Sequence, residues 1–314
     1  MPHAFAAVRG SDMRVFLAGA TGVIGRRLVP LLTGAGHQVT GLARTPAAAE
    51  RVRALGAEAA LADVFDAAAL GRVVGAAAPD VVIHQLTDLG GGPGPGNARI
   101  RQVGTRNLVD AARAAGARRI IAQSIAWAYQ AGPNPAAEDV PLDLGADEPR
   151  RDTVAGVAAL EAAVAELPEW VVLRYGLLYG PGTWYAAGAM MAERALTGEL
   201  AADADVSSFV HVDDAAAAAA AALSWPPGAV NVCDDEPAAG YDWVPVFCAS
   251  VGAPPPPSDP AGVDGDPAGV DGDRAGAGGA GGRHGWARGA SNSHARLDLG
   301  WSPSRPSWRS GFGG

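Results

Sequence analysis

Three glycines near the start of the chain, Gly19, Gly22 and Gly25, have the spacing and surroundings of a phosphate-binding turn. The apolar run at 15–18 is long enough for one buried strand, and residues 26–33 have the pattern of a helix. Such a turn presents backbone N–H groups at a helix N-terminus, where they bind a pyrophosphate. The alternative is a glycine turn that holds no ligand. We predict a pyrophosphate site that also includes Thr21, Val23 and Ile24.

The chain contains no lysine, so all 24 of its basic residues are arginines. Any mechanism that requires a lysine ammonium group, including Schiff-base chemistry, is therefore excluded. The formal net charge of −9 argues against a general nucleic-acid binder. No apolar run reaches the length of a membrane span, and we expect no membrane partner.

The two cysteines, Cys233 and Cys248, have no spacing typical of a metal site, and we predict no bound metal. Their small number is typical of a reduced, cytoplasmic protein. Residues 1–12 lack the long apolar segment of a secretory signal, and we expect a loose N-terminal arm there. The Gly/Pro/Asp repeat at 259–282 has too little apolar surface to fold, so we predict a disordered segment over about 254–285.

Several motifs resemble those of the short-chain dehydrogenase/reductase superfamily, in its extended, epimerase/dehydratase-like branch. The glycine turn matches the fingerprint TGxxGxxG, and further matches are Gly104-Thr-Arg-Asn-Leu108, Arg174-Tyr-Gly-Leu-Leu-Tyr-Gly-Pro-Gly182 and Phe209-Val-His-Val-Asp-Asp214. The resemblance covers about residues 13–253 and 288–312. It implies an α/β fold, a Rossmann-type doubly wound parallel sheet with a small C-terminal substrate lobe. The nucleotide-binding part would be residues 13–180, with 209–235 returning to it, and the lobe would lie mainly in 181–314.

The second expected strand ends at Arg44, where folds that prefer NAD usually carry an acidic residue for the ribose 2′-hydroxyl. A guanidinium group suits a 2′-phosphate instead, so we favour NADP over NAD. The alternative is an arginine on a solvated turn. The resemblance implies that Asp63 and Val64 lie beside the adenine and that Leu86 and Thr87 lie beside the ribose. It also implies that Tyr175 and Leu177 lie near the nicotinamide.

The resemblance also implies a catalytic tetrad, of which only Ser124 is present. Thr153 and Val157 stand in place of the tyrosine and lysine of the family's Tyr-x-x-x-Lys pair, and Arg101 stands in place of its asparagine. We consider Tyr129, just past Ser124, the best candidate for a substitute acid. Arg101, Arg150 or Arg151 would then supply the positive charge. The alternative for Tyr129 is an aromatic pocket wall.

We expect a small, uncharged or aromatic substrate, bound by apolar walls with a few polar tips. A predicted helix over 184–197 would form part of this pocket, although ordinary core packing explains its aromatic residues equally well. The expected pocket residues are Trp127, Tyr179, Trp184, Tyr185 and His211.

Three functions are compatible with these residues. The first is an atypical NADP-dependent reductase in which hydride transfer needs little acid–base assistance. The second is a redox-neutral epimerase, isomerase or dehydratase. The third is a non-catalytic NADP sensor or interaction protein. The resemblance also implies a homodimer, formed by the helices expected at 98–115 and 153–165.

Overall fold

The computed structural model describes residues 12–88, 95–257 and 283–312. Almost all of the predicted N-terminal arm, most of the glycine-rich segment 90–96 and the repeat at 259–282 lie outside the described residues. No helix in the described part of the chain combines the length and the apolar character needed to span a lipid bilayer.

A seven-stranded parallel sheet in the order β10-β6-β5-β4-β1-β2-β3 lies at the centre of the molecule. The strand order reverses between β1 and β4, and ligands of such sheets bind beyond the carboxyl ends of the strands at this point. This topology confirms the predicted doubly wound fold. The strands are β1 (Arg14–Ala18), β2 (Gln38–Ala43), β3 (Glu58–Leu61), β4 (Val81–His84), β5 (Arg119–Ile125), β6 (Glu169–Tyr175) and β10 (Gly228–Val232).

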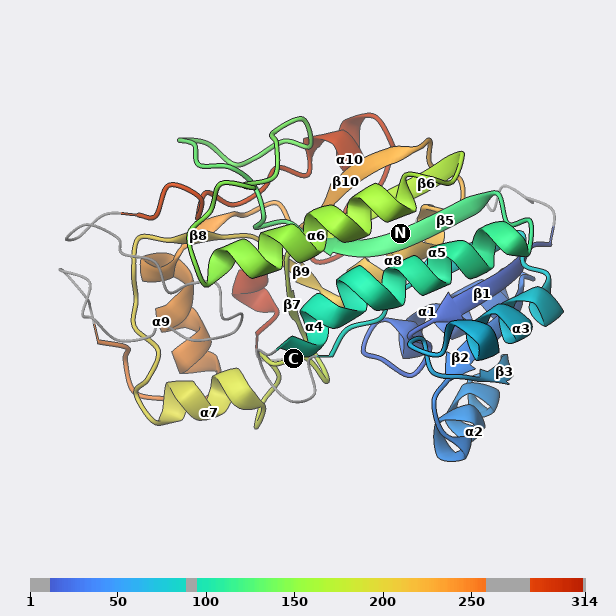
Figure 1. Cartoon of the computed structure of the whole chain (residues 1–314). Coiled ribbons are helices and arrows are strands. Elements are labelled where there is room, and N and C mark those ends of the chain that lie inside the picture. Colours follow the sequence, from blue (N-terminus) through green and yellow to red (C-terminus); the bar gives the residue numbers. More distant parts are fainter. Residues whose placement is uncertain (1–11, 89–94, 258–282, 313–314) are drawn as a thin grey trace.

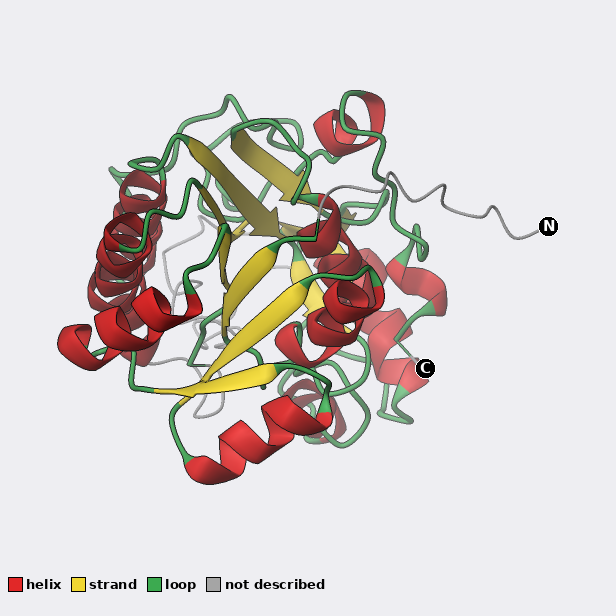
Figure 2. Ribbon diagram, turned by 90° about the vertical axis from the view of Figure 1, so that its right-hand side faces the viewer, coloured by secondary structure: helices red, strands yellow, loops and turns green. Residues whose placement is uncertain are grey.

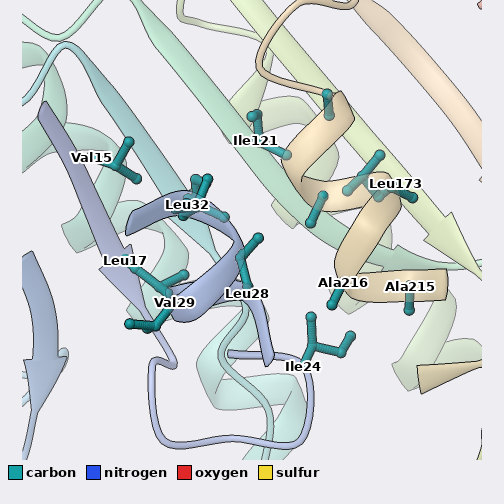
Figure 3. Packing of buried hydrophobic residues seen from close by; sticks show 14 of the residues in the cluster. Val15, Leu17, Ile24, Leu28, Val29, Leu32, Ile121, Leu173, Ala215 and Ala216 are labelled. Atoms are coloured by element: carbon teal, nitrogen blue, oxygen red, sulfur yellow. The ribbon is translucent and has the colours of Figure 1, made fainter. Parts of the chain in front are cut away.

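Helices cover both faces of this sheet (Figures 1 and 2), which explains why its strands are continuous apolar runs. One face carries α1 (Gly25–Gly34), α2 (Pro46–Ala54) and α8 (Val212–Ala221). The other carries α3 (Ala67–Ala77), α5 (Thr105–Ala114) and α6 (Arg150–Val164). Figure 3 shows Leu28 and Val29 of α1 in the hydrophobic core on the face that carries α1, α2 and α8, beside Leu17 of β1. This packing fixes the N-terminus of α1 against the carboxyl end of β1.

The helix that follows β4 is built from three consecutive pieces. These are α4 (Pro95–Arg99), a π-helical turn η1 (Ile100–Gly104) and α5. The π-helical turn widens the helix where it passes α6, against which α4 and η1 both pack.

The C-terminal lobe has its own aromatic core, which includes Phe209, Trp243, Phe247, Trp308 and Phe312. It is built from β7 (Leu177–Tyr179), α7 (Met190–Leu196), β8 (Val206–Ser207), β9 (Phe209–His211), β11 (Ala238–Ala239), α9 (Gly240–Ser250) and η2 (Trp308–Ser310). The helix α10 (Ser293–Leu297) packs instead against β10 of the central sheet. The strand β7 pairs with β9 in parallel, and β8 pairs with β11 in antiparallel fashion.

The predicted helix over 184–197 is wrong in its first half, because α7 begins only at Met190. Gly188 has a φ of 71°, a left-handed conformation that a right-handed helix cannot contain. Residues 183–189 therefore form turns that carry Trp184 and Tyr185.

Candidate dinucleotide and active site

The glycine turn has the shape of a pyrophosphate cradle. Gly19 has a φ of 96°, and a Cβ there would collide with the Gln85 carbonyl. A Cβ on Gly25 would collide with the Gly19 carbonyl, so only glycine lets α1 start this close to β1. Gly22 is exposed, and a Cβ there would lie 3.2 Å from the Gly19 carbonyl oxygen. The residues present therefore fit a dinucleotide.

The neighbours of these glycines contribute mainly through their backbone. The Ile24 side chain is buried in the core, so only its main chain faces the turn. Thr21 and Val23 are half-buried at the surface of the turn.

The adenosine end of the site lies beyond β2 and β3. Arg44 is exposed directly after β2 and forms no ion pair within the described residues. Thr45 caps α2 by accepting from Ala48 N at 3.2 Å, which fixes the backbone beside Arg44. The Asp63 carboxylate accepts from Phe65 N at 2.9 Å, and Val64 is buried in the core. Asp66 rather than Asp63 caps α3, and Asp63 is exposed.

Residues at the end of β4 are tied to their neighbours. His84 is fully buried, its Nε2 lies 2.9 Å from Thr105 Oγ1, and burial lowers its pKa to about 4. The Leu86 carbonyl accepts from Gln123 Nε2 at 2.7 Å, while Thr87 is exposed.

Tyr175 and Leu177 present little to a nicotinamide. The Tyr175 side chain points into the core towards Ala215 O, at 3.3 Å. Leu177 is buried in the aromatic lobe. The burial of these two side chains therefore does not support the predicted contact with a nicotinamide.

Both predicted catalytic residues belong to a buried polar network. Ser124 donates to Glu161 Oε1 at 2.7 Å, and Glu161 forms a two-pronged ion pair with Arg174 at 2.7 and 3.0 Å. The Tyr129 hydroxyl lies 2.9 Å from Arg174 Nη1 and donates to Asn231 Oδ1 at 2.5 Å. The network thus joins β5, α6, β6 and β10 behind the cleft.

The geometry of Tyr129 argues against the predicted role as a general acid. Its side chain is 1% exposed and its hydroxyl is already bonded on both sides. Burial raises the pKa of Tyr129 far above its usual value, although Arg174 acts in the opposite direction. The positive charge beside the Tyr129 hydroxyl comes from Arg174, whereas the predicted Arg150 donates to the Tyr129 main-chain carbonyl. This geometry favours a structural role for Tyr129 over proton transfer.

The predicted pocket residues separate into two groups. Tyr185 and Tyr179 are buried in the aromatic core, where both contact Phe312. His211 is buried against Tyr179 and caps α8 by accepting from Asp213 N at 3.2 Å. Trp127 and Trp184 are half-buried at the edge of the same core, so they are the two that can face a substrate.

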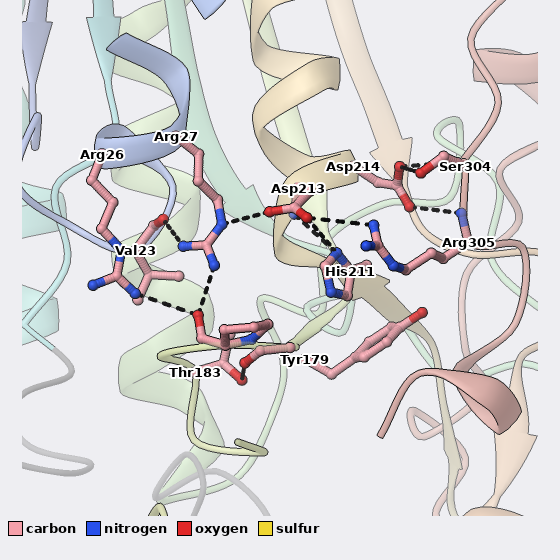
Figure 4. A network of polar contacts seen from close by, with 12 residues as sticks. Val23, Arg26, Arg27, Tyr179, Thr183, His211, Asp213, Asp214, Ser304 and Arg305 are labelled. Atoms are coloured by element: carbon pink, nitrogen blue, oxygen red, sulfur yellow. Dashed lines mark hydrogen bonds and ion pairs between the residues drawn. The ribbon is translucent and has the colours of Figure 1, made fainter. Parts of the chain in front are cut away.

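An arginine pair joins the glycine turn to the lobe (Figure 4). Arg27 binds Asp213 at 2.6 Å and the Pro181 carbonyl at 2.8 Å, and Arg26 reaches the same carbonyl at 3.3 Å. The sequence analysis missed this pair and the Glu161–Arg174 ion pair. The sequence features that could have indicated these contacts are the two arginines directly after Gly25 and the arginine that begins the 174–182 motif.

A model of the NAD-dependent epimerase/dehydratase family matches residues 15–233. The chain belongs to this family. It is 44% identical over 314 residues to a 3-diazoavenalumate denitrifying reductase from Streptomyces sp, covering 96% of this chain and 99% of the relative. A ceramide reductase from Caulobacter vibrioides is 30% identical over 234 residues, which are 74% of this chain and 68% of the relative. These reductases confirm the predicted NAD(P)-dependent oxidoreductase.

Solved epimerase/dehydratase structures share the fold. The Bordetella bronchiseptica enzyme WbmG in complex with NAD superposes with a TM-score of 0.73 at 21% identity, covering 98% of this chain and 93% of WbmG. The UDP-glucose 4-epimerase of Thermus thermophilus, also in complex with NAD, gives a TM-score of 0.71 at 23% identity, with 95% and 96% covered.

The helix α6 carries the two positions at which the resemblance implies the Tyr-x-x-x-Lys pair, and it has neither a tyrosine nor a lysine there. Val157 is buried in an apolar cluster with Val154, and Thr153 is half-buried. The Arg101 side chain lies over Gly156, with its Cδ 3.3 Å from where a Cβ would stand. Arg101 of η1 therefore packs against α6 one residue before Val157.

Proposed function

We propose that this epimerase/dehydratase family member is an NADPH-dependent reductase that replaces the diazonium group of an aromatic substrate with hydride. The proposal combines the near full-length likeness to a denitrifying reductase of a diazo compound with the state of the catalytic residues. The observation that carries it is the engagement of Ser124 and Tyr129 in the Glu161–Arg174 network, which leaves neither hydroxyl ready to transfer a proton.

The proposed reaction needs no proton donor. The carbon–nitrogen bond of the arenediazonium ion breaks, its electron pair leaves with dinitrogen, and hydride takes the vacant place on carbon. Hydride cancels the positive charge of the diazonium ion, so no proton is gained or lost overall. A bound reduced nicotinamide supplies that hydride. The protein then has to hold the two reactants in contact, and positioning alone gives large accelerations.

The chain supports this task with three parts. The glycine turn holds the diphosphate, and Arg44 selects the 2′-phosphate of NADP because its planar fork suits a phosphate. The half-buried Trp127 and Trp184 provide aromatic faces for a flat, electron-poor substrate. The epimerase chemistry of the structural neighbours is disfavoured, because the described site offers no Tyr-x-x-x-Lys pair for it.

The test is turnover of 4-carboxybenzenediazonium with NADPH, measured as loss of NADPH absorbance above the enzyme-free rate. We expect one NADPH consumed for each benzoate and each dinitrogen formed. Tight NADPH binding without turnover of this probe or of larger arenediazonium ions would favour the sensor function instead.

Specificity for the 2′-phosphate is tested with Arg44→Gln, and Arg72→Gln is the control. Arg72 is an exposed arginine on the opposite face of the sheet, so its replacement makes the same change in charge. We expect Arg44→Gln to reduce the preference for NADPH over NADH. Unchanged discrimination would remove Arg44 from the site.

A further inference from the structure

The first turn of α1 carries an exposed arginine that stands over the pyrophosphate cradle. Arg26 follows Gly22 by four residues, and Arg26 N donates to the Gly22 carbonyl at 3.0 Å. Side chains on a helix lean towards its N-terminus and lie above the residue four places earlier. The Arg26 side chain therefore leans over Gly22, the glycine that leaves space for a phosphate.

A second glycine accommodates the guanidinium group from the other side. Gly182 has a φ of 83°, and a Cβ there would collide with Arg26 Nη2. The guanidinium thus lies between the glycine turn and the loop 180–183 that follows β7. Figure 4 shows the Arg26 side chain running past Val23 towards this loop.

The two neighbouring arginines differ in how their charge is used. Arg27 pairs with Asp213 and is held at the Val23 carbonyl as well. Among the described residues Arg26 forms no ion pair, and its hydrogen bond to the Pro181 carbonyl, at 3.3 Å, is longer than that of Arg27. Arg27 would therefore still hold the loop if Arg26 released the Pro181 carbonyl and bound an anion instead.

We propose that Arg26 binds the nicotinamide-side phosphate of the dinucleotide and exchanges the Pro181 carbonyl for it. The loop 180–183 lies on the β6 side of the switch point, towards the nicotinamide, whereas Arg44 lies on the β2 side. In this proposal Arg44 binds the adenosine 2′-phosphate of the dinucleotide and Arg26 binds its diphosphate bridge. This inference rests on the proposed NADP site and adds a residue that reads the diphosphate bridge.

Calorimetric titration with three ligands separates the two arginines. NADPH and 2′-phospho-ADP-ribose contain the diphosphate bridge, whereas adenosine 2′,5′-bisphosphate lacks the nicotinamide-side phosphate. Arg26→Gln should weaken binding of the first two by about tenfold or more, as expected for a lost charge-assisted hydrogen bond. It should leave the bisphosphate within about twofold of wild type, given the same bond count. Arg26→Lys keeps the positive charge but lacks the planar guanidinium fork, so its affinity for the two diphosphate ligands should lie between those of wild type and Arg26→Gln.

Arg72→Gln is the control for net charge, and the melting temperature of each variant reports its folding. The proposal is overturned if Arg26→Gln binds the diphosphate ligands as wild type does, or weakens all three ligands equally. If wild type binds none of the three, the NADP assignment fails together with it. Wild-type binding that Arg26→Gln leaves intact removes only the Arg26 proposal.

Discussion

Asp234→Asn should abolish most of the loss of stability that this protein shows between about pH 6.5 and pH 9. Asp234 follows β10 and is 1% exposed. Its Oδ1 accepts from Glu236 N at 3.3 Å, and Oδ2 is buried without a hydrogen-bond partner among the described residues. Burial raises the pKa of this carboxyl group to about 8, and the neighbouring carboxylates Asp235 and Glu236 add to the shift.

The sign of the pH dependence follows from proton binding. The folded protein keeps a proton on Asp234 up to about pH 8, whereas the unfolded chain releases it near the ordinary aspartate pKa of 3.8. Stability from this group is therefore complete below the unfolded pKa and is lost as the pH rises through the folded pKa. Each pH unit between the unfolded and folded pKa values costs about 1.4 kcal/mol, and the loss levels off above about pH 8. Between about pH 6.5 and pH 9 it therefore amounts to about 2 kcal/mol.

Urea denaturation at several pH values in this range measures the effect. The asparagine side chain has the shape of the protonated carboxyl group and does not titrate, so the unfolding free energy of Asp234→Asn should change little with pH. Asp139→Asn is the control, because Asp139 is exposed and forms no hydrogen bond within the described residues. The reasoning is refuted if wild type and Asp234→Asn lose stability in parallel.

Three other replacements test the assignments around the cleft. Tyr129→Phe should lower the free energy of unfolding by about 1 to 3 kcal/mol, because Arg174 loses a hydrogen-bond partner. Turnover per folded molecule should stay near that of wild type. A turnover loss of about a hundredfold would instead support Tyr129 as the general acid. Glu161→Gln should cost about 3 to 5 kcal/mol in urea denaturation, because it breaks a buried ion pair, and a loss below about 1 kcal/mol would contradict that. Gly22→Ala should keep the melting temperature, since the added Cβ meets only the Gly19 carbonyl, at 3.2 Å. It should weaken NADPH binding in calorimetry. Unchanged affinity would mean that Gly22 is not part of the phosphate-binding turn.

The fold was predictable because its signals are local. Strands and helices alternate along the first half of the chain, and most of these strands coincide with a short run of buried residues, although β3 does not. The helix predicted over 184–197 failed because local apolar pattern cannot reveal that Gly188 adopts a left-handed conformation. That conformation depends on how the loop meets the lobe, which is not a local property.

The candidate site was less predictable, because its side chains are directed by distant parts of the chain. The position of Ser124 at the end of β5 was predicted, but its partner lies on a helix 37 residues later. Likewise the Tyr129 hydroxyl is bonded to Asn231, 102 residues away. Sequence spacing predicts which strand end carries a hydroxyl group, whereas only the folded structure shows that the hydroxyl is already occupied.

The occupied hydroxyls also limit the reactions that this site can perform. Reduction of a carbonyl group leaves an alkoxide, and a site with neither an acid nor a lysine stabilises that charge poorly. An arenediazonium ion brings its own positive charge and a leaving group that takes no proton, so hydride transfer produces no anion. Reduction of such a substrate therefore does not need the acid–base groups that are absent at positions 153 and 157. The proposed reaction would depend on the glycine turn and on the two arginines, Arg26 and Arg44, that we propose as dinucleotide contacts.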